Sequence, residues 1–226
     1  MRLDISEKPS APIALFDLDY TLLDGDSEAL WGRFLFEKGL VGQDFLEQMT
    51  AYYRDYEQGT LDVYQYEAFL LQPLTLHLTE NILGLRDEYL DRVHDVVRPA
   101  LMRRVEWHRQ QDHILILITA TNNFLAEPIA SMLGFSNLIC TQIRLERGRF
   151  TTNLDGIPAF REGKILLLEK WLDESGNSFK GSWGYSDSHN DLQLLGLVDH
   201  AVVVSPDDLL RNYASLRNWE IMEENT

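Results

Sequence analysis

The strongest constraint on the fold is a series of short runs that are apolar on successive residues. The runs occupy residues 13–16, 113–118, 138–143, 183–185 and 201–204. Continuous apolar runs suit strands of a parallel sheet that is covered on both faces, whereas a half-exposed strand alternates. Segments with a helical pattern separate the later runs, at about 123–133, 162–173 and 191–197. This alternation predicts an α/β fold built on a doubly wound parallel sheet.

Residues 26–98 differ from the rest of the chain because they contain no strand-like run. Four helical patterns fill most of this stretch, at 28–38, 43–58, 61–71 and 87–97. A Gly or Pro lies just after each pattern. Gly and Pro are typical residues just after a helix ends. We therefore expect an all-helical cap domain, 26–98, inserted into a core formed by 1–25 and 99–226.

Composition narrows the possible partners and the compartment. The 226 residues are 45% hydrophobic, enough for a sizeable core, and the net charge of −16 repels nucleic acids and anionic membranes. The apolar runs are far shorter than the roughly 20 residues that span a bilayer, and the N-terminus lacks a signal-peptide pattern. A single cysteine, Cys140, cannot form an internal disulfide. We expect a cytoplasmic protein that binds neither nucleic acid nor membrane; the sequence gives no prediction of its oligomeric state.

Two carboxylates directly follow the first apolar run. Asp17 and Asp19 belong to the segment Asp-Leu-Asp-Tyr-Thr, at the expected carboxyl end of a strand. In an open parallel sheet, the ligand crevice lies outside the carboxyl ends of the strands. Two such carboxylates can converge on one cation, and one can attack while the other transfers protons.

Polar residues follow other expected strands as well. Thr119 and Ala120 come at a strand end before a helix, where a hydroxyl and free amides favour an anion, although a threonine there is more often a helix cap. Lys164 lies in the first turn of a helix, where the dipole disfavours a cation, so its ammonium is expected to pair elsewhere. Asp187 and Asp191 follow a further strand and offer hard oxygen ligands for Mg²⁺, with Asp191 alternatively holding a metal-bound water or positioning Lys164.

Together these motifs resemble the haloacid dehalogenase superfamily of phosphohydrolases, over nearly the whole chain. The helical insertion resembles the cap of its phosphoserine-phosphatase-like branch. The resemblance implies a Rossmann-like sheet of five parallel strands with the Asp17 strand in the centre, a Mg²⁺ cofactor and an aspartyl-phosphate mechanism. The resemblance implies Asp17 as nucleophile and Asp19 as general acid and base. It also implies that four residues surround the phosphate: Thr119, Ala120, Lys164 and Asn190. Four residues would lie at the metal, Asp17, Asp19, Asp187 and Asp191, with Asp19 binding through its backbone carbonyl. Asp187 follows Gly184 by three residues, whereas the family motif commonly opens Gly-Asp.

The cap predicts a small phosphate ester as substrate. In the resembled branch, an acid at the start of the cap binds the substrate ammonium, and Asp26 has that position, with Glu28 nearby; Arg54 is the candidate for a substrate carboxylate. An acidic, aromatic cap without an obvious carboxylate clamp favours L-histidinol phosphate over phosphoserine. A phosphotransferase using the same nucleophile and a non-catalytic binding protein remain as alternatives.

Overall fold

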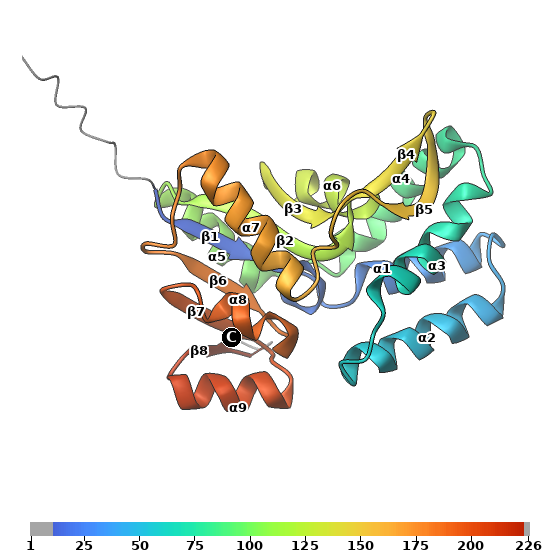
Figure 1. The fold of residues 1–226 in the computed structure, drawn as a ribbon. Coiled ribbons are helices and arrows are strands. Elements are labelled where there is room, and N and C mark those ends of the chain that lie inside the picture. The colour runs from blue at the N-terminus through green and yellow to red at the C-terminus, as the bar shows by residue number, and fades with distance from the viewer. Residues whose placement is uncertain (1–10, 224–226) are drawn as a thin grey trace, which may run out of the picture.

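The computed structural model describes residues 11–223, so the N-terminal segment that lacks a signal-peptide pattern lies outside the described residues. A parallel six-stranded sheet forms the centre of the α/β core, in the order β3-β2-β1-β6-β7-β8 (Figure 1). Its strands are β1 (Ile13–Phe16), β2 (Ile114–Asn122), β3 (Asn137–Thr141), β6 (Trp183–Ser186), β7 (His200–Val204) and β8 (Glu220–Met222).

The five strands expected from the sequence are all present, and β1 lies in the middle of those five. The four residues of β1 are fully buried, as the continuous apolar run predicts for a central parallel strand. The sixth strand, β8, adds an edge beside β7. This short strand has only three residues and carries a charged Glu220, so no apolar run marks it in the sequence.

Helices cover both faces of the sheet, which confirms the doubly wound arrangement (Figure 1). On one face, α5 (Pro99–Gln110) and α6 (Asn123–Met132) pack against Ala14 and Phe16 of β1. On the other face, α7 (Glu162–Ser175) and α8 (Leu192–Leu195) pack against Ile13 and Leu15. The last helix, α9 (Asp208–Arg217), buries Leu210 and Ala214 against the β7 side of the sheet.

Between β1 and α5 the chain forms four helices, as expected for the inserted segment. They are α1 (Ser27–Glu37), α2 (Gln43–Glu57), α3 (Val63–Thr75) and α4 (Thr79–Asp95). The two connections to the core run side by side, because Leu23 and Val97 form an antiparallel bridge. Arg98 strengthens this junction by donating from Nε to the Leu23 carbonyl at 3.1 Å. We propose that these connections bound the cap at residues 26–98, with 1–25, of which 1–10 lie outside the described residues, and 99–226 as the core.

A β-hairpin that the sequence analysis did not anticipate extends from the core to the cap helices. Its strands are β4 (Ile143–Glu146) and β5 (Arg149–Leu154), and β5 lies along α3. The connecting residues Arg147 and Gly148 both have positive φ, 53° and 76°, as a two-residue type I′ turn requires. The helical insertion is therefore covered on one side by a hairpin from the segment assigned to the core.

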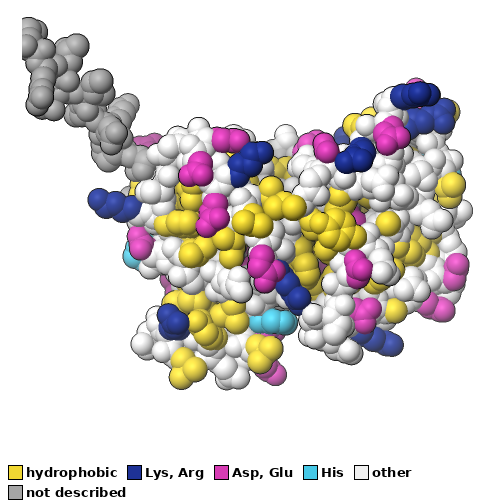
Figure 2. Space-filling view, in the orientation of Figure 1, with side chains coloured by type: hydrophobic (Ala, Val, Ile, Leu, Met, Phe, Trp, Pro, Cys, Tyr) yellow, Lys and Arg dark blue, Asp and Glu magenta, His cyan; other side chains and the backbone are white. Residues whose placement is uncertain are grey.

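The surface agrees with the acidic composition. Figure 2 shows acidic side chains scattered over the visible face, among apolar and neutral ones, without one dominant patch. Within residues 11–223, no helix is long and apolar enough to cross a membrane.

Candidate active site

The side chains predicted to act together meet at the carboxyl ends of β1 and β6. Asp17 directly follows β1, and its backbone N–H donates to the Tyr185 carbonyl at 3.0 Å, which continues the ladder between the two strands. Lys164 Nζ donates to Asp17 Oδ1 and to Asp191 Oδ2, both at 2.7 Å. All three groups are buried. The ammonium in the first turn of α7 thus pairs with carboxylates from two other elements.

The local backbone at the start of α7 sets the position of Lys164. A Cβ on Gly163 would lie 2.0 Å from the Pro158 carbonyl oxygen, so this approach of loop to helix requires glycine. Asp191 is in turn held by Ser186, whose hydroxyl donates to Asp191 Oδ2 at 2.8 Å. Asp191 therefore contacts the Lys164 ammonium, as one of the two roles expected for it requires.

Asp17 and Asp187 converge on a common donor. The Thr21 hydroxyl lies 3.5 Å from Asp17 Oδ2 and 3.2 Å from Asp187 Oδ1. Thr21 belongs to η1 (Leu18–Leu22), a single irregular turn in which Tyr20 has a positive φ of 54°. The turn brings the threonine of the first motif back to the strand end, beside both carboxylates.

The oxygen-rich surroundings of Asp17 and Asp187 fit a divalent cation such as Mg²⁺. Within the described residues, no three His, Cys, Asp or Glu side chains make a metal centre by themselves. Two carboxylates, together with a backbone carbonyl, phosphate and water, match the habit of Mg²⁺, which keeps several non-protein ligands. The donor set therefore suits magnesium with a bound phosphate better than a metal held by protein side chains alone.

Asp19 is held at the junction of β2 and the first cap helix. Its Oδ1 accepts from the Ser27 N–H at 2.6 Å, and its Oδ2 accepts from the Thr121 hydroxyl at 2.7 Å. Ser27 and Thr121 were not singled out in the sequence. Thr121 lies two residues after Thr119 on β2, and the two-residue period of a strand was the available signal that both face the same side.

The predicted phosphate-binding residues come from different elements: Thr119 and Ala120 from the end of β2, Lys164 from α7, and Asn190 from the short helical turn after β6. Thr119 is buried and its Oγ1 accepts from the Thr121 N–H at 3.1 Å, while the Ala120 carbonyl accepts from Thr141 at 2.6 Å. Asn190 Oδ1 accepts from Arg161 Nε at 2.8 Å. His189, the histidine of the fourth motif, pairs with Asp207 at 2.8 Å.

A second set of contacts joins the cap to these loops. The Tyr56 hydroxyl of α2 lies 3.0 Å from the Ser188 hydroxyl, and Arg161 donates to the Gly59 carbonyl at 3.2 Å. Arg161 has a positive φ of 51°, an uncommon conformation for a side chain that is not glycine and one that needs support from its surroundings. Its side chain therefore bridges the end of α2 and Asn190.

The three expected cap residues have different environments. Asp26 caps α1, since its Oδ1 accepts from the Ala29 N–H at 2.7 Å. Glu28 is buried and accepts from Asn122 Nδ2 at 3.3 Å, whereas Arg54 is exposed on α2. Glu67 and Asn122, which join Glu28, were not singled out. The sequence offered no signal for them beyond an acid in an otherwise apolar part of α3.

Burial and crowding of carboxylates dominate the electrostatics of the site. Burial raises the pKa of Asp17 to about 7 against the opposing effect of Lys164, and burial with the Asp26 charge raises the pKa of Asp19 to about 7. Burial and the charges of Asp17 and Asp191 raise the pKa of Asp187 well above its usual range. For Lys164, burial favours the neutral form, but the two carboxylates outweigh it and raise the pKa. One ammonium thus faces several carboxylates, and further positive charge would stabilise the site.

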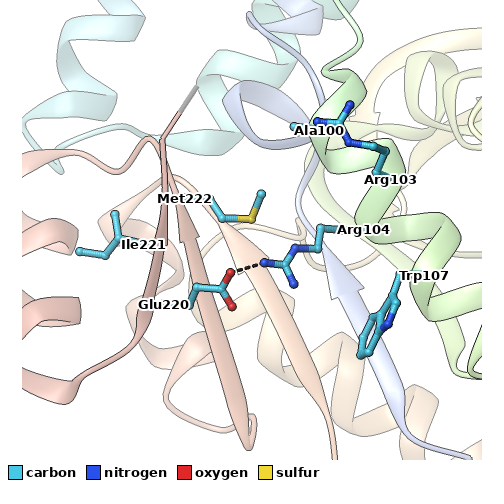
Figure 3. A pocket seen from close by; sticks show the side chains of 7 residues that line it. All are labelled: Ala100, Arg103, Arg104, Trp107, Glu220, Ile221 and Met222. Carbon is cyan, nitrogen blue, oxygen red and sulfur yellow. Dashed lines mark hydrogen bonds and ion pairs between the residues drawn. The ribbon is translucent and has the colours of Figure 1, made fainter. Parts of the chain in front are cut away.

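A surface pocket away from the strand-end cluster contains none of the predicted site residues. It measures about 450 Å³ and lies between α5 and β8. Arg103, Trp107 and Met222 line it, and Arg104 reaches across to pair with Glu220 (Figure 3). Its lining holds one carboxylate, already paired, and no nucleophile or candidate metal ligand comparable to the strand-end cluster.

Three known proteins show what the chain is similar to. Histidinol-phosphatase from Neisseria meningitidis serogroup C is 36% identical over 216 residues, covering 93% of this chain and 97% of that protein. A protein with unknown function from Bordetella pertussis Tohama I has a crystal structure that matches with a TM-score of 0.87 at 32% identity, covering 95% of this chain and 99% of that chain. A substrate-bound phosphoserine phosphatase matches with a TM-score of 0.71 at 14% identity, covering 96% and 94%, which shows a shared fold.

The family model of haloacid dehalogenase-like hydrolases matches residues 14–196, which include every strand-end motif described above. The match covers most of the chain and agrees with the parallel sheet and with the relatives at 32% and 36% identity. The chain therefore belongs to the haloacid dehalogenase-like hydrolases, and among them it is a phosphatase.

Proposed function

We propose that the protein is a magnesium-dependent phosphomonoesterase that acts through an aspartyl-phosphate on Asp17, with L-histidinol phosphate as its substrate. The observation that carries the proposal is the placement of Asp17, with one oxygen on Lys164 at 2.7 Å and the other beside Thr21 and Asp187. The proposed enzyme works in the cytoplasm, in keeping with a single buried cysteine, Cys140.

In the proposed first step, an Asp17 carboxylate oxygen attacks the phosphorus atom. The bond between phosphorus and the ester oxygen breaks, and Asp19 gives its proton to the departing alcohol. A pKa raised to about 7 leaves Asp19 partly protonated near neutral pH, as a general acid requires. The Ser27 N–H and the Thr121 hydroxyl hold this carboxyl in place on the cap side of Asp17.

In the second step, water attacks the phosphorus atom of the aspartyl-phosphate. Asp19, now ionised, takes a proton from this water, and the bond between phosphorus and the Asp17 oxygen breaks. Inorganic phosphate leaves, and Asp17 and the protonated Asp19 are restored. Because Asp19 reverses its role between the steps, its pKa should lie near the working pH.

Positive charge must offset the repulsion between Asp17 and a phosphate dianion. Lys164 supplies one charge, and we assign the phosphate oxygens to it together with Thr119, Ala120 and Asn190. Mg²⁺ bound by Asp17, Asp187 and the Asp19 carbonyl would supply Lewis-acid charge stabilisation. Asp191 is proposed to act on the metal site indirectly, through Lys164 or a metal-bound water.

The substrate proposal rests on the acidic cap and on the relative at 36% identity that is named histidinol-phosphatase. Asp26 and Glu28 lie at the start of α1, beside Asp19, where they would face a cationic alcohol. Arg54, the candidate for a carboxylate, is exposed. This distribution of charge favours an amino alcohol over an amino acid.

Two experiments test the proposal. The first compares phosphate release from L-histidinol phosphate and from O-phosphoserine; we expect at least a hundredfold higher kcat/KM for the former. A preference for phosphoserine would reverse the substrate assignment, and inertness toward both would remove it.

The second experiment uses Asp17→Asn, which should abolish turnover of every ester and of p-nitrophenyl phosphate. Asp24→Asn is a suitable control because Asp24 is an exposed residue of the same loop that pairs with Arg98. Substantial turnover by Asp17→Asn protein, checked for deamidation, would exclude Asp17 as the nucleophile.

A further inference from the structure

Two buried carboxylates meet one buried amide between the cap and the core. Glu28 comes from α1, Glu67 from α3 and Asn122 from the end of β2. Asn122 Nδ2 donates to Glu28 Oε1 at 3.3 Å and to Glu67 Oε2 at 3.1 Å. The exposed fractions of the three residues are 7%, 1% and 3%. Three separate elements thus bring two acids together away from water.

The charges around this pair are negative. Those that act on Glu28 belong to Glu67, Asp26 and Asp19. Two further titratable side chains face Glu28: Tyr66 of α3 and Tyr89 of α4. The charge of Glu28 raises the pKa of both tyrosines. Burial raises the pKa of Glu67 to about 8, and burial with the Glu67 charge raises that of Glu28 well above its usual range. Carboxylates this deep require a cation or a proton.

The amide of Asn122 adds an independent sign that a ligand belongs here. Because Nδ2 serves both carboxylates, the orientation of the amide is fixed and Oδ1 must face the other way. Oδ1 is fully buried and accepts no hydrogen bond within the described structure. A buried acceptor without a donor is costly, so a group that donates hydrogen bonds would stabilise it.

A small cavity borders two of the three residues, Glu28 and Asn122. Its lining includes Glu28 and Asn122, the aromatic rings of Trp31 and Phe124, and leucines of α3. The volume is about 10 Å³, which suits one water-sized group. An ammonium group has that size, donates three hydrogen bonds and is attracted to aromatic faces as well as to carboxylates.

The cluster is directly joined to the catalytic residues. Asn122 follows Thr121, which donates to Asp19 at 2.7 Å, and Glu28 follows Ser27, whose N–H donates to the same carboxyl at 2.6 Å. The Thr121 and Ser27 hydroxyls also contact each other at 3.3 Å. Along the chain, the cluster therefore begins one residue from each of the two groups that hold the proposed general acid.

We infer that Glu28, Glu67 and Asn122 form a subsite that binds the ammonium group of a phosphorylated amino alcohol. The inference rests on the proposed function for the location of the phosphate, and it adds Glu67 and Asn122 as residues that determine specificity. The two carboxylates supply the counter-charge, and Asn122 Oδ1 accepts the remaining hydrogen bond. A neutral alcohol of the same size would leave the carboxylates without a counter-charge.

The test compares two esters that differ in one group. O-Phosphoethanolamine and propyl phosphate have similar chains, but the first ends in an ammonium and the second in a methyl group. We expect the wild-type enzyme to prefer phosphoethanolamine at least tenfold in kcat/KM. Glu67→Gln keeps the shape and removes the charge, so it should lower this preference at least tenfold, mainly through the KM for phosphoethanolamine.

Glu88→Gln is the matched control, because Glu88 is an exposed glutamate of the cap that pairs with Lys38. It should leave the preference unchanged. If Glu67→Gln does not fold, Glu28→Gln is measured in the same way, with the same expected loss of preference.

Three outcomes would overturn the inference. One is a wild-type enzyme that does not prefer phosphoethanolamine over propyl phosphate. Another is an equal loss for both esters in every folded variant, which would make the cluster a structural link between cap and core. The third is a preference that survives the loss of charge. Failure of the proposed substrate gives a different result, since the enzyme would then reject L-histidinol phosphate while keeping the contrast between the two simple esters.

Discussion

Replacing Lys164 by methionine should damage stability and activity through the same contacts. Its ammonium lies in the interior with an exposed fraction of 4% and pairs with Asp17 and Asp191, both at 2.7 Å. Methionine fills a similar volume, so the change removes the charge and leaves the packing of α7 largely intact. Two buried carboxylates then lose their counter-charge.

The expected loss of stability follows from the burial of the pair. Removing one partner of a buried ion pair costs about 3–5 kcal/mol, because the other charge stays buried and unpaired. Asp191 retains the Ser186 hydroxyl at 2.8 Å, so we expect the lower end of this range, about 3 kcal/mol. Turnover should fall at least about 10²–10³-fold, the usual effect of losing one group that stabilises charge in the transition state.

The measurement is urea unfolding at fixed pH in EDTA, so that bound metal does not mask the change. Lys180→Met is the control; Lys180 is exposed, and its replacement should change the free energy of unfolding by less than about 0.5 kcal/mol. Adding Asp191→Asn to Lys164→Met should recover about 1–2 kcal/mol, because one unpaired charge disappears. A double variant less stable than Lys164→Met alone would refute the explanation by unpaired buried charge.

Two further predictions concern metal and pH. EDTA should abolish activity. Adding Mg²⁺ should restore activity and raise the melting temperature, because the cation offsets the negative charges of Asp17 and Asp187. If neither activity nor melting temperature responds to EDTA and Mg²⁺, the metal site is contradicted. Burial, with the nearby His113 and Arg104, lowers the pKa of His108 to about 3. The neutral His108 therefore stabilises the folded state fully above pH 6.5, the usual pKa of histidine. This contribution is lost as the pH falls below 6.5, because the unfolded chain then gains a proton that the folded protein does not. Between pH 8 and pH 5 this effect should cost about 1–2 kcal/mol of unfolding free energy, measured by urea titration, and His108→Gln should show a correspondingly smaller loss.

The sheet was predictable from the sequence because its strands are apolar on successive residues. The run at 13–16 coincides with β1, and the run at 201–204 falls short of β7 by one residue. The hairpin β4–β5 was missed because its strands are short: the alternation Ile-Arg-Leu-Glu covers only four residues, and β5 has only two apolar residues, Phe150 and Leu154. Its turn, Arg147-Gly148, was the available signal, since Gly favours the positive φ that such turns need.

Some helix boundaries were predicted wrongly because Pro and Gly were treated only as residues that end a helix. Pro99 was taken to follow a helix, but it is the first residue of α5, a position where its missing N–H costs nothing. Helix α4 begins at Thr79, eight residues before the predicted start at 87, and Gly84 lies inside it. Helix α3 continues past Pro73 to Thr75. For Gly84 and Pro73, tertiary packing outweighs a weak local preference, whereas Pro99 follows the local preference of proline for the first turn of a helix.

Most of the motif residues could be predicted from the sequence, because Asp17, Thr119 and Asp187 lie at or near the carboxyl ends of strands, and the sheet brings those ends together. Side chains that depend on contacts across elements could not. Nothing in the sequence distinguishes Asn122 from other residues at strand ends. Its two partners, Glu28 and Glu67, are 39 positions apart and come together only in the folded chain. Sequence spacing carries no record of such a meeting.

Charge balance connects the catalytic centre with the choice of substrate. A protein of net charge −16 must attract a phosphate dianion to a site that already holds Asp17, Asp19, Asp187 and Asp191. Lys164 offsets one of these charges, and a divalent cation would offset two more. The acids of the cap would then repel a simple anionic ester, but they attract one that carries its own ammonium. If the proposed substrate is correct, the cluster that disfavours phosphate alone would favour a phosphorylated amine, and the cap would select its substrate by charge before shape.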